Sequence, residues 1–227
     1  MQKRTLTQIK KALQELSKKG WIKSLRKHNT GIGKTLESYL NLKENNIALP
    51  DFGKLELKSQ RLESASLITL FTKKPDDVLN SKILNRFGYP RKKDGLYVLH
   101  QTITSGRSNK QGFRLKNIKQ KLSILKKGKY IFSYDKDKLR KLFDRKVGKG
   151  VIIALATSQK DGKGKERFHY KEAYILKAGN FNKFLENLFY DIRIGRYPDG
   201  RPHDHGSAFR VKKTALPNIF KAYRRLI

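Results

Sequence analysis

The stretch Pro50-Asp51-Phe52-Gly53-Lys54-Leu55-Glu56-Leu57-Lys58 ends in four residues that alternate between apolar and polar side chains. This period of two predicts a β-strand with Glu56 and Lys58 on one face, because successive side chains point to opposite sides of a strand. Asp51 precedes the strand between a proline and a glycine, where a turn can bring its carboxylate back towards Glu56. The segment therefore predicts a strand face that carries two carboxylates and an ammonium group.

Two carboxylates beside a lysine are typical of a nuclease that uses a divalent metal ion. Carboxylate oxygens are ligands that Mg²⁺ prefers, so Asp51 and Glu56 are the expected metal ligands. Such an ion lowers the pKa of a bound water and stabilises charge on the phosphate that is cut. Lys58 can stabilise the developing negative charge. The alternative is an amphipathic strand with a solvated Glu/Lys face, a common arrangement on half-exposed sheets.

The composition indicates a nucleic-acid partner. The chain has 53 Lys and Arg against 19 Asp and Glu, a formal net charge of +34, which favours a polyanion. Hydrophobic residues make up 37% of the chain, with 12 Phe and 10 Tyr, enough for a folded core. The absence of Cys excludes disulfides, thiol catalysis and Cys-based zinc sites. Without a signal-peptide pattern or an apolar run long enough for a membrane, we expect a soluble, cytoplasmic protein.

Apolar periodicity predicts an α/β (α+β) fold with a mixed central sheet flanked by helices. We expect one compact domain over residues 1–227, or two lobes flanking a DNA cleft, a catalytic lobe of about 1–75 with 95–180 and a base-recognition lobe of about 181–227. The strand that ends at Lys58 is expected to pair with residues 66–71. Helices are expected at 6–20, 30–40, 135–143, 180–190 and 216–226, and further strands at 95–103, 129–134, 150–158 and 168–177.

The segment Gly31-Ile32-Gly33-Lys34-Thr35 resembles the tail of a nucleotide-binding P-loop. That motif requires a glycine five residues before Gly33, where this chain has His28. A helix that begins at glycines is the favoured interpretation. Glu37 would lie on its first turns, where it can reach the metal cluster or stabilise the helix N-terminus.

Residues 191–210 form a stretch that is rich in Arg, His and Asp and is expected to be rich in turns. Arg can donate twice to guanine, His can donate to its N7 or O6, and Asp can accept from the cytosine amino group, so the stretch suits G·C pairs in the major groove. Two alternatives remain. His203 and His205 could bind zinc with Asp204, or a solvated loop could contact phosphates alone.

Taken together, these segments resemble the MvaI/BcnI family of restriction endonucleases, whose fold is similar to that of the mismatch-repair nicking enzyme MutH. Gly33-x-Thr35-Leu36-Glu37 resembles the family's helix with its acidic residue. Pro50-Asp51 and Glu56-Leu57-Lys58 resemble its metal site, and Thr69-Leu70-Phe71 resembles the adjoining strand. The residues that resemble its recognition residues for G·C pairs are Asp191, Arg193, His203, His205 and Arg210.

The resemblance implies a PD-(D/E)xK restriction-endonuclease-like fold and a Mg²⁺-dependent type II restriction enzyme with catalytic residues Glu37, Asp51, Glu56 and Lys58. It implies a monomer that acts on double-stranded DNA at a CC-N-GG-like target, nicks one strand per binding event and has a cognate DNA methyltransferase as its functional companion. A MutH-like repair nickase, which needs partner proteins, is one alternative. A non-catalytic basic nucleic-acid-binding protein is another, against which the Asp51, Glu56 and Lys58 set argues.

Overall fold

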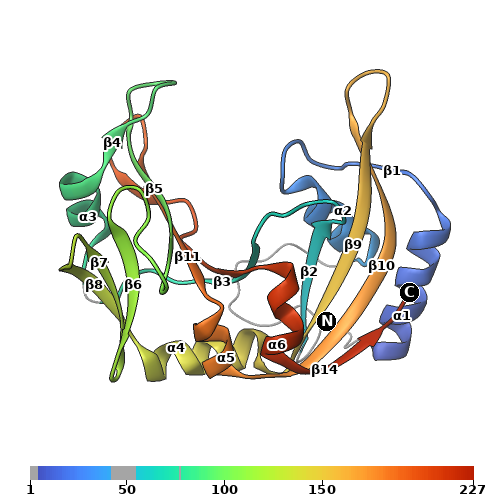
Figure 1. Cartoon of the computed structure of the whole chain (residues 1–227). Helices are drawn as coiled ribbons and strands as arrows, with labels where there is room; N and C mark the ends of the chain where they lie inside the picture. The colour runs from blue at the N-terminus through green and yellow to red at the C-terminus, as the bar shows by residue number, and fades with distance from the viewer. Residues whose placement is uncertain (1–4, 42–54, 77) are drawn as a thin grey trace. The chain divides into compact units, whose positions relative to one another are not determined.

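A computed structural model describes residues 5–41, 55–76 and 78–227 (Figure 1). The chain divides into two compact units. Unit 1 comprises Met1–Ile68, Asp144–Phe181 and Lys213–Ile227, and unit 2 comprises Thr69–Phe143 and Asn182–Lys212. Residues 95–143, expected from the sequence to lie with the first lobe, thus belong to unit 2, and the last fifteen residues belong to unit 1. Among the described residues, no helix is long and apolar enough to cross a membrane.

Unit 1 is built on a five-stranded mixed sheet, as predicted. β10 (Glu166–Gly179) pairs antiparallel with β1 (Ile22–Lys23), β9 (Gly150–Lys160) and β14 (Phe220–Arg225). β2 (Glu56–Arg61) pairs in parallel with β9 at one edge. The predicted pairing of residues 66–71 with this strand is wrong, because β3 (Ile68–Thr72) belongs to a different sheet. Two parallel strands can be neighbours only if a long connection joins them. The parallel partner of β2 is accordingly β9, which lies much later in the chain.

Two helices cover this sheet with apolar side chains. α1 (Leu6–Lys18) begins with a capping box between Thr5 and Gln8 and buries Ile9, Leu13 and Leu16. α2 (Gly31–Tyr39) packs against β2 and adds Ile32 and Leu36 to the same core as Leu57. Gly31 and Gly33 are thus helical residues, as the glycine-started helix predicted, and they do not form a phosphate-cradling loop.

Unit 2 contains a six-stranded and a three-stranded sheet. In the larger sheet, β11 (Phe189–Arg196) lies between β5 (Tyr97–Thr104) and β13 (Ala208–Val211) and also pairs with β12 (Pro202–Asp204). β3 and β4 (Tyr89–Pro90) form its edges. The smaller sheet consists of β6 (Phe113–Ile118), β7 (Lys121–Lys126) and β8 (Lys129–Asp135). Buried rings that contact one another fill the core, among them Phe71, Tyr134, Phe184, Tyr190 and Phe209.

The remaining elements are short helices. They are α3 (Asn80–Phe87), α4 (Lys136–Phe143), the π-helix η1 (Asp144–Gly148), α5 (Phe181–Glu186), the 3₁₀ helix η2 (Lys213–Ala215) and α6 (Leu216–Ile219). The predicted helix over 216–226 is wrong beyond residue 219, since the chain continues there as β14 along β10. The expectation of a turn-rich 191–210 is also wrong, because most of these residues lie in β11, β12 and β13.

Candidate functional site

Glu56 and Lys58 lie side by side on β2, as the alternation of the sequence predicts. The Lys58 ammonium forms an ion pair of 2.7 Å with Glu56 Oε1. Glu56 is only 5% exposed, whereas a solvated Glu/Lys face would leave its carboxylate in water. Burial of a charge costs several kcal/mol unless a partner compensates it, and the Lys58 ammonium provides that compensation.

A second lysine approaches the same carboxylate from η1. The Lys146 ammonium lies 3.8 Å from Glu56 Oε2, so Glu56 has a positive charge beside each of its oxygens. Glu37 is half-buried on α2. The first turn of this helix lies next to β2, where a Cβ on Gly33 would make an ordinary contact of 3.6 Å with Ser59 Oγ. Asp51 lies outside the described residues.

The chemistry of these side chains fits a hard divalent cation. The buried carboxylate of Glu56 offers oxygen ligands of the kind that Mg²⁺ prefers. In the part of the chain that the structure describes, no three His, Asp and Glu side chains are grouped to hold a metal ion. The zinc alternative for His203, His205 and Asp204 therefore gains no support.

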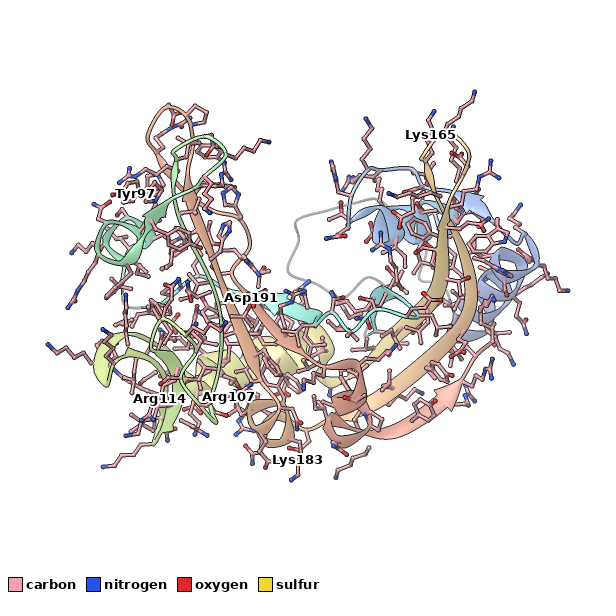
Figure 2. All side chains as sticks on the ribbon, turned by 45° about the horizontal axis from the view of Figure 1, so that its top comes forward. Tyr97, Arg107, Arg114, Lys165, Lys183 and Asp191 are labelled. Carbon is pink, nitrogen blue, oxygen red and sulfur yellow. The ribbon has the colours of Figure 1, made fainter. Side chains whose placement is uncertain are left out.

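In unit 2, Asp191, labelled in Figure 2, lies on β11 and accepts several hydrogen bonds. It is 1% exposed and accepts a hydrogen bond of 2.6 Å from Thr102 Oγ1. Its other oxygen accepts from Arg193, at 3.1 Å, and from Arg210. Burial raises the pKa of Asp191, but the hydrogen bonds from Thr102 and Arg210 and the two positive charges outweigh burial and hold it below its usual value. The carboxylate is therefore ionised and fixes both guanidinium groups.

The two predicted histidines lie next to this network. His205 N donates to Arg193 O at 2.7 Å, and the His203 and His205 rings pack edge to face with centroids 4.5 Å apart. His203 Nδ1 is 2.6 Å from the hydroxyl of Tyr197. Burial, together with the charge of His203, lowers the pKa of His205. A neutral imidazole retains one N–H donor and one acceptor, which suits hydrogen bonding to a base edge.

Three residues that the sequence patterns did not single out join these clusters: Thr102, His100 and Lys146. Thr102 lies opposite Asp191 and His100 opposite Arg193, because β5 pairs with β11. The His100 ring also contacts that of His205, at 6.3 Å between centroids. Burial, followed by the charge of Arg193, lowers the pKa of His100. The available signal was the pair of polar residues His100 and Thr102 on one face of the strand predicted over 95–103, but its partner strand could not be known.

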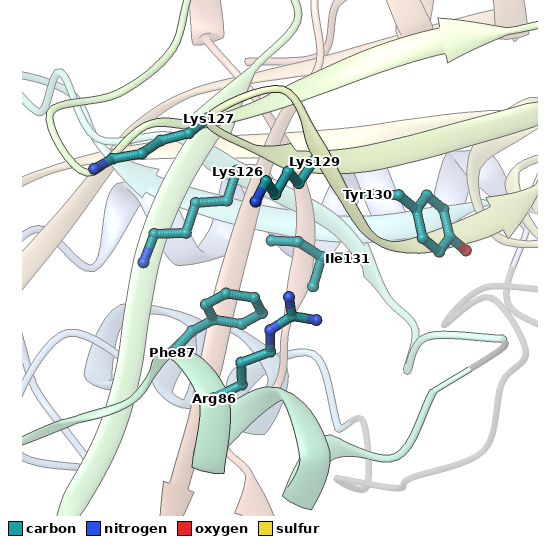
Figure 3. Close-up of a pocket in the computed structure, with 7 residues that line it drawn as sticks. All are labelled: Arg86, Phe87, Lys126, Lys127, Lys129, Tyr130 and Ile131. Atoms are coloured by element: carbon teal, nitrogen blue, oxygen red, sulfur yellow. The ribbon is translucent and has the colours of Figure 1, made fainter.

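One cavity lies away from these clusters. It has a volume of about 200 Å³ in unit 2 and is lined by residues of α3, β7 and β8, among them Phe87, Lys126 and Tyr130 (Figure 3). The Lys126 ammonium lies 4.9 Å from the centroid of the Phe87 ring. This cavity contains none of the predicted site residues.

Comparisons with known proteins identify the family of the chain. The family model of the MvaI/BcnI restriction endonuclease family matches residues 10–220. The solved complex of the restriction endonuclease MvaI with a cognate DNA substrate is 28% identical over 100% of both chains, with a TM-score of 0.87. MvaI in the absence of DNA, at the same identity and coverage, has a TM-score of 0.57. No curated protein matches the chain. The chain therefore belongs to the MvaI/BcnI restriction endonuclease family and is a type II site-specific endonuclease that cuts DNA.

Proposed function

We propose that this restriction enzyme is a Mg²⁺-dependent monomer that cuts duplex DNA at a CC-N-GG-like site and nicks one strand per binding event. The observation that carries the catalytic part is the buried Glu56 carboxylate in an ion pair with Lys58 on β2. A buried acid is costly for stability, and charged groups that are buried beside a specific partner gather at functional sites. A catalytic role in the DNA cleavage typical of the family would explain why the chain retains this destabilising buried carboxylate.

Glu56 and Asp51 are the residues that would hold the metal ion. When bound, the ion lowers the pKa of a coordinated water and stabilises charge on the phosphate. The chain's own contribution is positional. Glu56 is fixed between Lys58 and Lys146, and Glu37, on α2, would be a further acidic catalytic residue. The Lys58 side chain is 22% exposed, so it can contact the scissile phosphate and stabilise the negative charge that grows as water adds and the sugar oxygen leaves.

Arg193, Arg210, His203 and His205 would read guanines, and Asp191 would orient the two arginines. The support is the Asp191 network. Its carboxylate is buried and already accepts three hydrogen bonds, which favours an orienting role over direct contact with a cytosine. Arg193 and Arg210 keep 36% and 25% of their side chains exposed, so each can still reach a base. A guanidinium held in this way is prepared for bidentate hydrogen bonding to guanine.

The proposal extends to the cellular setting. A DNA methyltransferase with the same target would be the functional companion, because an unprotected chromosome would be cut. Both enzymes would act in the cytoplasm, where foreign DNA that enters the cell is cut.

The test of the catalytic proposal is digestion of one sequenced plasmid by the purified protein alone. We expect discrete fragments with Mg²⁺, no cleavage with EDTA, nicked circles before linear molecules, and fragment ends that share one short G·C-rich sequence. Asp51→Ala should abolish cleavage and leave binding intact in a gel-shift assay with Ca²⁺. Cleavage that required added partner proteins would support the MutH-like alternative, and undiminished cleavage by Asp51→Ala would refute the metal site.

A further inference from the structure

A large basic cavity lies in unit 1, apart from Glu56 and Lys58. Its volume is about 820 Å³, between the segment that follows β1 and the tip of the β9–β10 hairpin. Lys160, Lys163 and Lys165 line it from the hairpin, Arg26 and Lys27 line it from the segment, and Lys23 lines it from the end of β1. Figure 2 shows Lys165 at the hairpin tip. Among the described residues that line the cavity, Glu166 is the one acid, so the cavity carries a strong positive charge.

The nearby acids do not neutralise the hairpin lysines. Glu166 Oε1 accepts from Arg61 Nε at 2.8 Å. Asp161 Oδ1 accepts from the backbone N–H groups of Lys163 and Lys165, at 3.0 and 2.9 Å, and the second of these hydrogen bonds is the main cause of its lowered pKa. In the described part of the chain, Lys160, Lys163 and Lys165 form no ion pair. Their ammonium groups therefore remain available to a ligand.

The walls of the cavity are tied together, so the charges are held in place before a ligand binds. Ser24 N donates to Glu166 O at 2.9 Å and joins the segment to the hairpin. Leu25 N donates to Thr35 Oγ1 at 3.0 Å and joins it to α2. Any Cβ on Gly31 would collide with Arg26 O and Ser24 Oγ, which shows how tightly the segment folds against the start of α2.

The position of Arg61 relates the cavity to the catalytic residues. Arg61 lines the cavity and lies on β2 together with Glu56. A strand rises about 3.3 Å per residue, so Arg61 lies roughly 17 Å along β2 from Glu56. Duplex DNA rises about 3.4 Å per base pair, so the same distance corresponds to about five base pairs. Arg61 is an odd number of residues from Glu56, so its side chain leaves the opposite face of β2. Because β2 is the edge strand of its sheet, a duplex with its scissile phosphate at Glu56 would have to pass that edge to present another phosphate to the cavity.

The geometry points to a second DNA-binding site here, an anchor for backbone phosphates about five base pairs from the cut. These phosphates lie at the end of the recognition sequence or just outside it, and the site holds the duplex without reading its bases. The inference rests on the catalytic assignment of Glu56. In this inference, the hairpin lysines increase the affinity for DNA and set the minimum length of duplex that the enzyme binds tightly.

The test combines a charge removed from the protein with a charge removed from the DNA. Binding is measured in Ca²⁺ on cognate duplexes in which one phosphate at a time is replaced by an uncharged methylphosphonate. For the wild type we expect a loss of affinity of roughly two- to fivefold at one or two flanking positions, the range of an ion pair at a protein surface. For Lys163→Ala/Lys165→Ala the same methylphosphonates should cause no further loss, because interacting partners are not additive.

Lys10→Ala/Lys11→Ala is the matched control, since it removes two exposed lysines of α1 from the same unit and should keep the wild-type pattern. An unchanged flanking loss in the hairpin variant, or no flanking loss in the wild type, would overturn the anchor. Failure of the catalytic assignment would be visible separately, as undiminished cleavage of the unmodified cognate duplex by Glu56→Gln with Mg²⁺.

Discussion

The Glu56 carboxylate is nearly out of water, yet it lies on the edge strand of its sheet next to a partly exposed lysine. For stability alone, an apolar side chain of similar size would serve at least as well, because buried ion pairs often contribute little beyond their desolvation cost. The pair is better explained by reaction chemistry. A fixed ammonium group near a phosphate provides stabilisation that needs no rearrangement at the moment of reaction.

Lys58→Ala should therefore lower the single-turnover rate of cleavage with saturating enzyme. Loss of one preorganised electrostatic donor typically costs on the order of a hundredfold or more. Lys11→Ala, on the exposed face of α1, is the control and should cut at the wild-type rate. A reduction of less than about threefold at Lys58 would show that the residue only compensates the charge of Glu56.

Arg210→Ala should weaken binding to cognate DNA more than binding to a scrambled duplex. A bidentate base contact is worth roughly 1–3 kcal/mol of discrimination, about 5- to 150-fold, whereas a phosphate contact weakens all sequences alike. The measurement is a competition between the two duplexes with Ca²⁺ and no turnover. Because Arg210 also compensates the buried Asp191, Arg210→Lys is the second variant, which keeps the charge but lacks the planar fork. Equal weakening for both duplexes would make Arg210 a phosphate-binding residue.

At the scale of elements, β11 positions the recognition residues through its neighbours. Its Gly195 leaves room for His205, since a Cβ there would be 2.7 Å from His205 Nε2. Gly195→Ala should displace the imidazole and reduce discrimination between cognate DNA and single-base variants, at a stability cost of about 1 kcal/mol or less, because a side chain can give way by rotating. Gly106→Ala, where a Cβ would meet nothing within 4 Å, is the control. Wild-type discrimination by Gly195→Ala would exclude His205 from base reading.

The elements also show what the sequence could and could not predict. Local sequence patterns were sufficient to predict α1, because its capping box and the spacing of its apolar residues are local features of the sequence. They were also sufficient to predict that Glu56 and Lys58 share one face of a strand. The spacing of Leu216, Phe220, Tyr223 and Leu226 favours a helix, yet residues 220–225 extend along β10, whose edge offers a ladder of backbone hydrogen bonds. Tertiary pairing there outweighs a local pattern.

Non-local pairing also explains the residues that were missed. Thr102 reaches Asp191 across 89 residues of sequence, and His100 faces Arg193 only because β5 and β11 are neighbours. The same cause divides the chain into units made of distant segments. Alternation in a single sequence predicts which side chains share one face of a strand, but it does not identify the strand that pairs with it. The sequence could therefore predict only some of the residues in each cluster.

At the scale of the whole molecule, several of the acids that the structure describes are already engaged by groups of the same chain. Glu56, Asp191 and Glu166 each pair with a cation of the same chain, and Asp161 caps a turn. The excess of 53 Lys and Arg over 19 Asp and Glu therefore remains mostly on surfaces that water or DNA can reach. Such an excess of positive charge attracts the enzyme to DNA of any sequence, and this attraction weakens as the salt concentration rises.

Affinity for DNA should accordingly fall steeply with salt, for cognate and scrambled duplexes alike. Each phosphate neutralised on a duplex contributes about −0.9 to the slope of log K against log salt, so neutralisation of roughly six to ten phosphates gives a slope of about −5 to −9. The measurement is a titration with Ca²⁺ at several NaCl concentrations. Lys163→Ala/Lys165→Ala should reduce the slope by about one for each phosphate that the variant no longer neutralises, while Lys10→Ala/Lys11→Ala should leave it unchanged. A nearly flat dependence would mean that bases rather than phosphates dominate binding, and it would contradict both the general electrostatic attraction and the anchor at the β9–β10 hairpin.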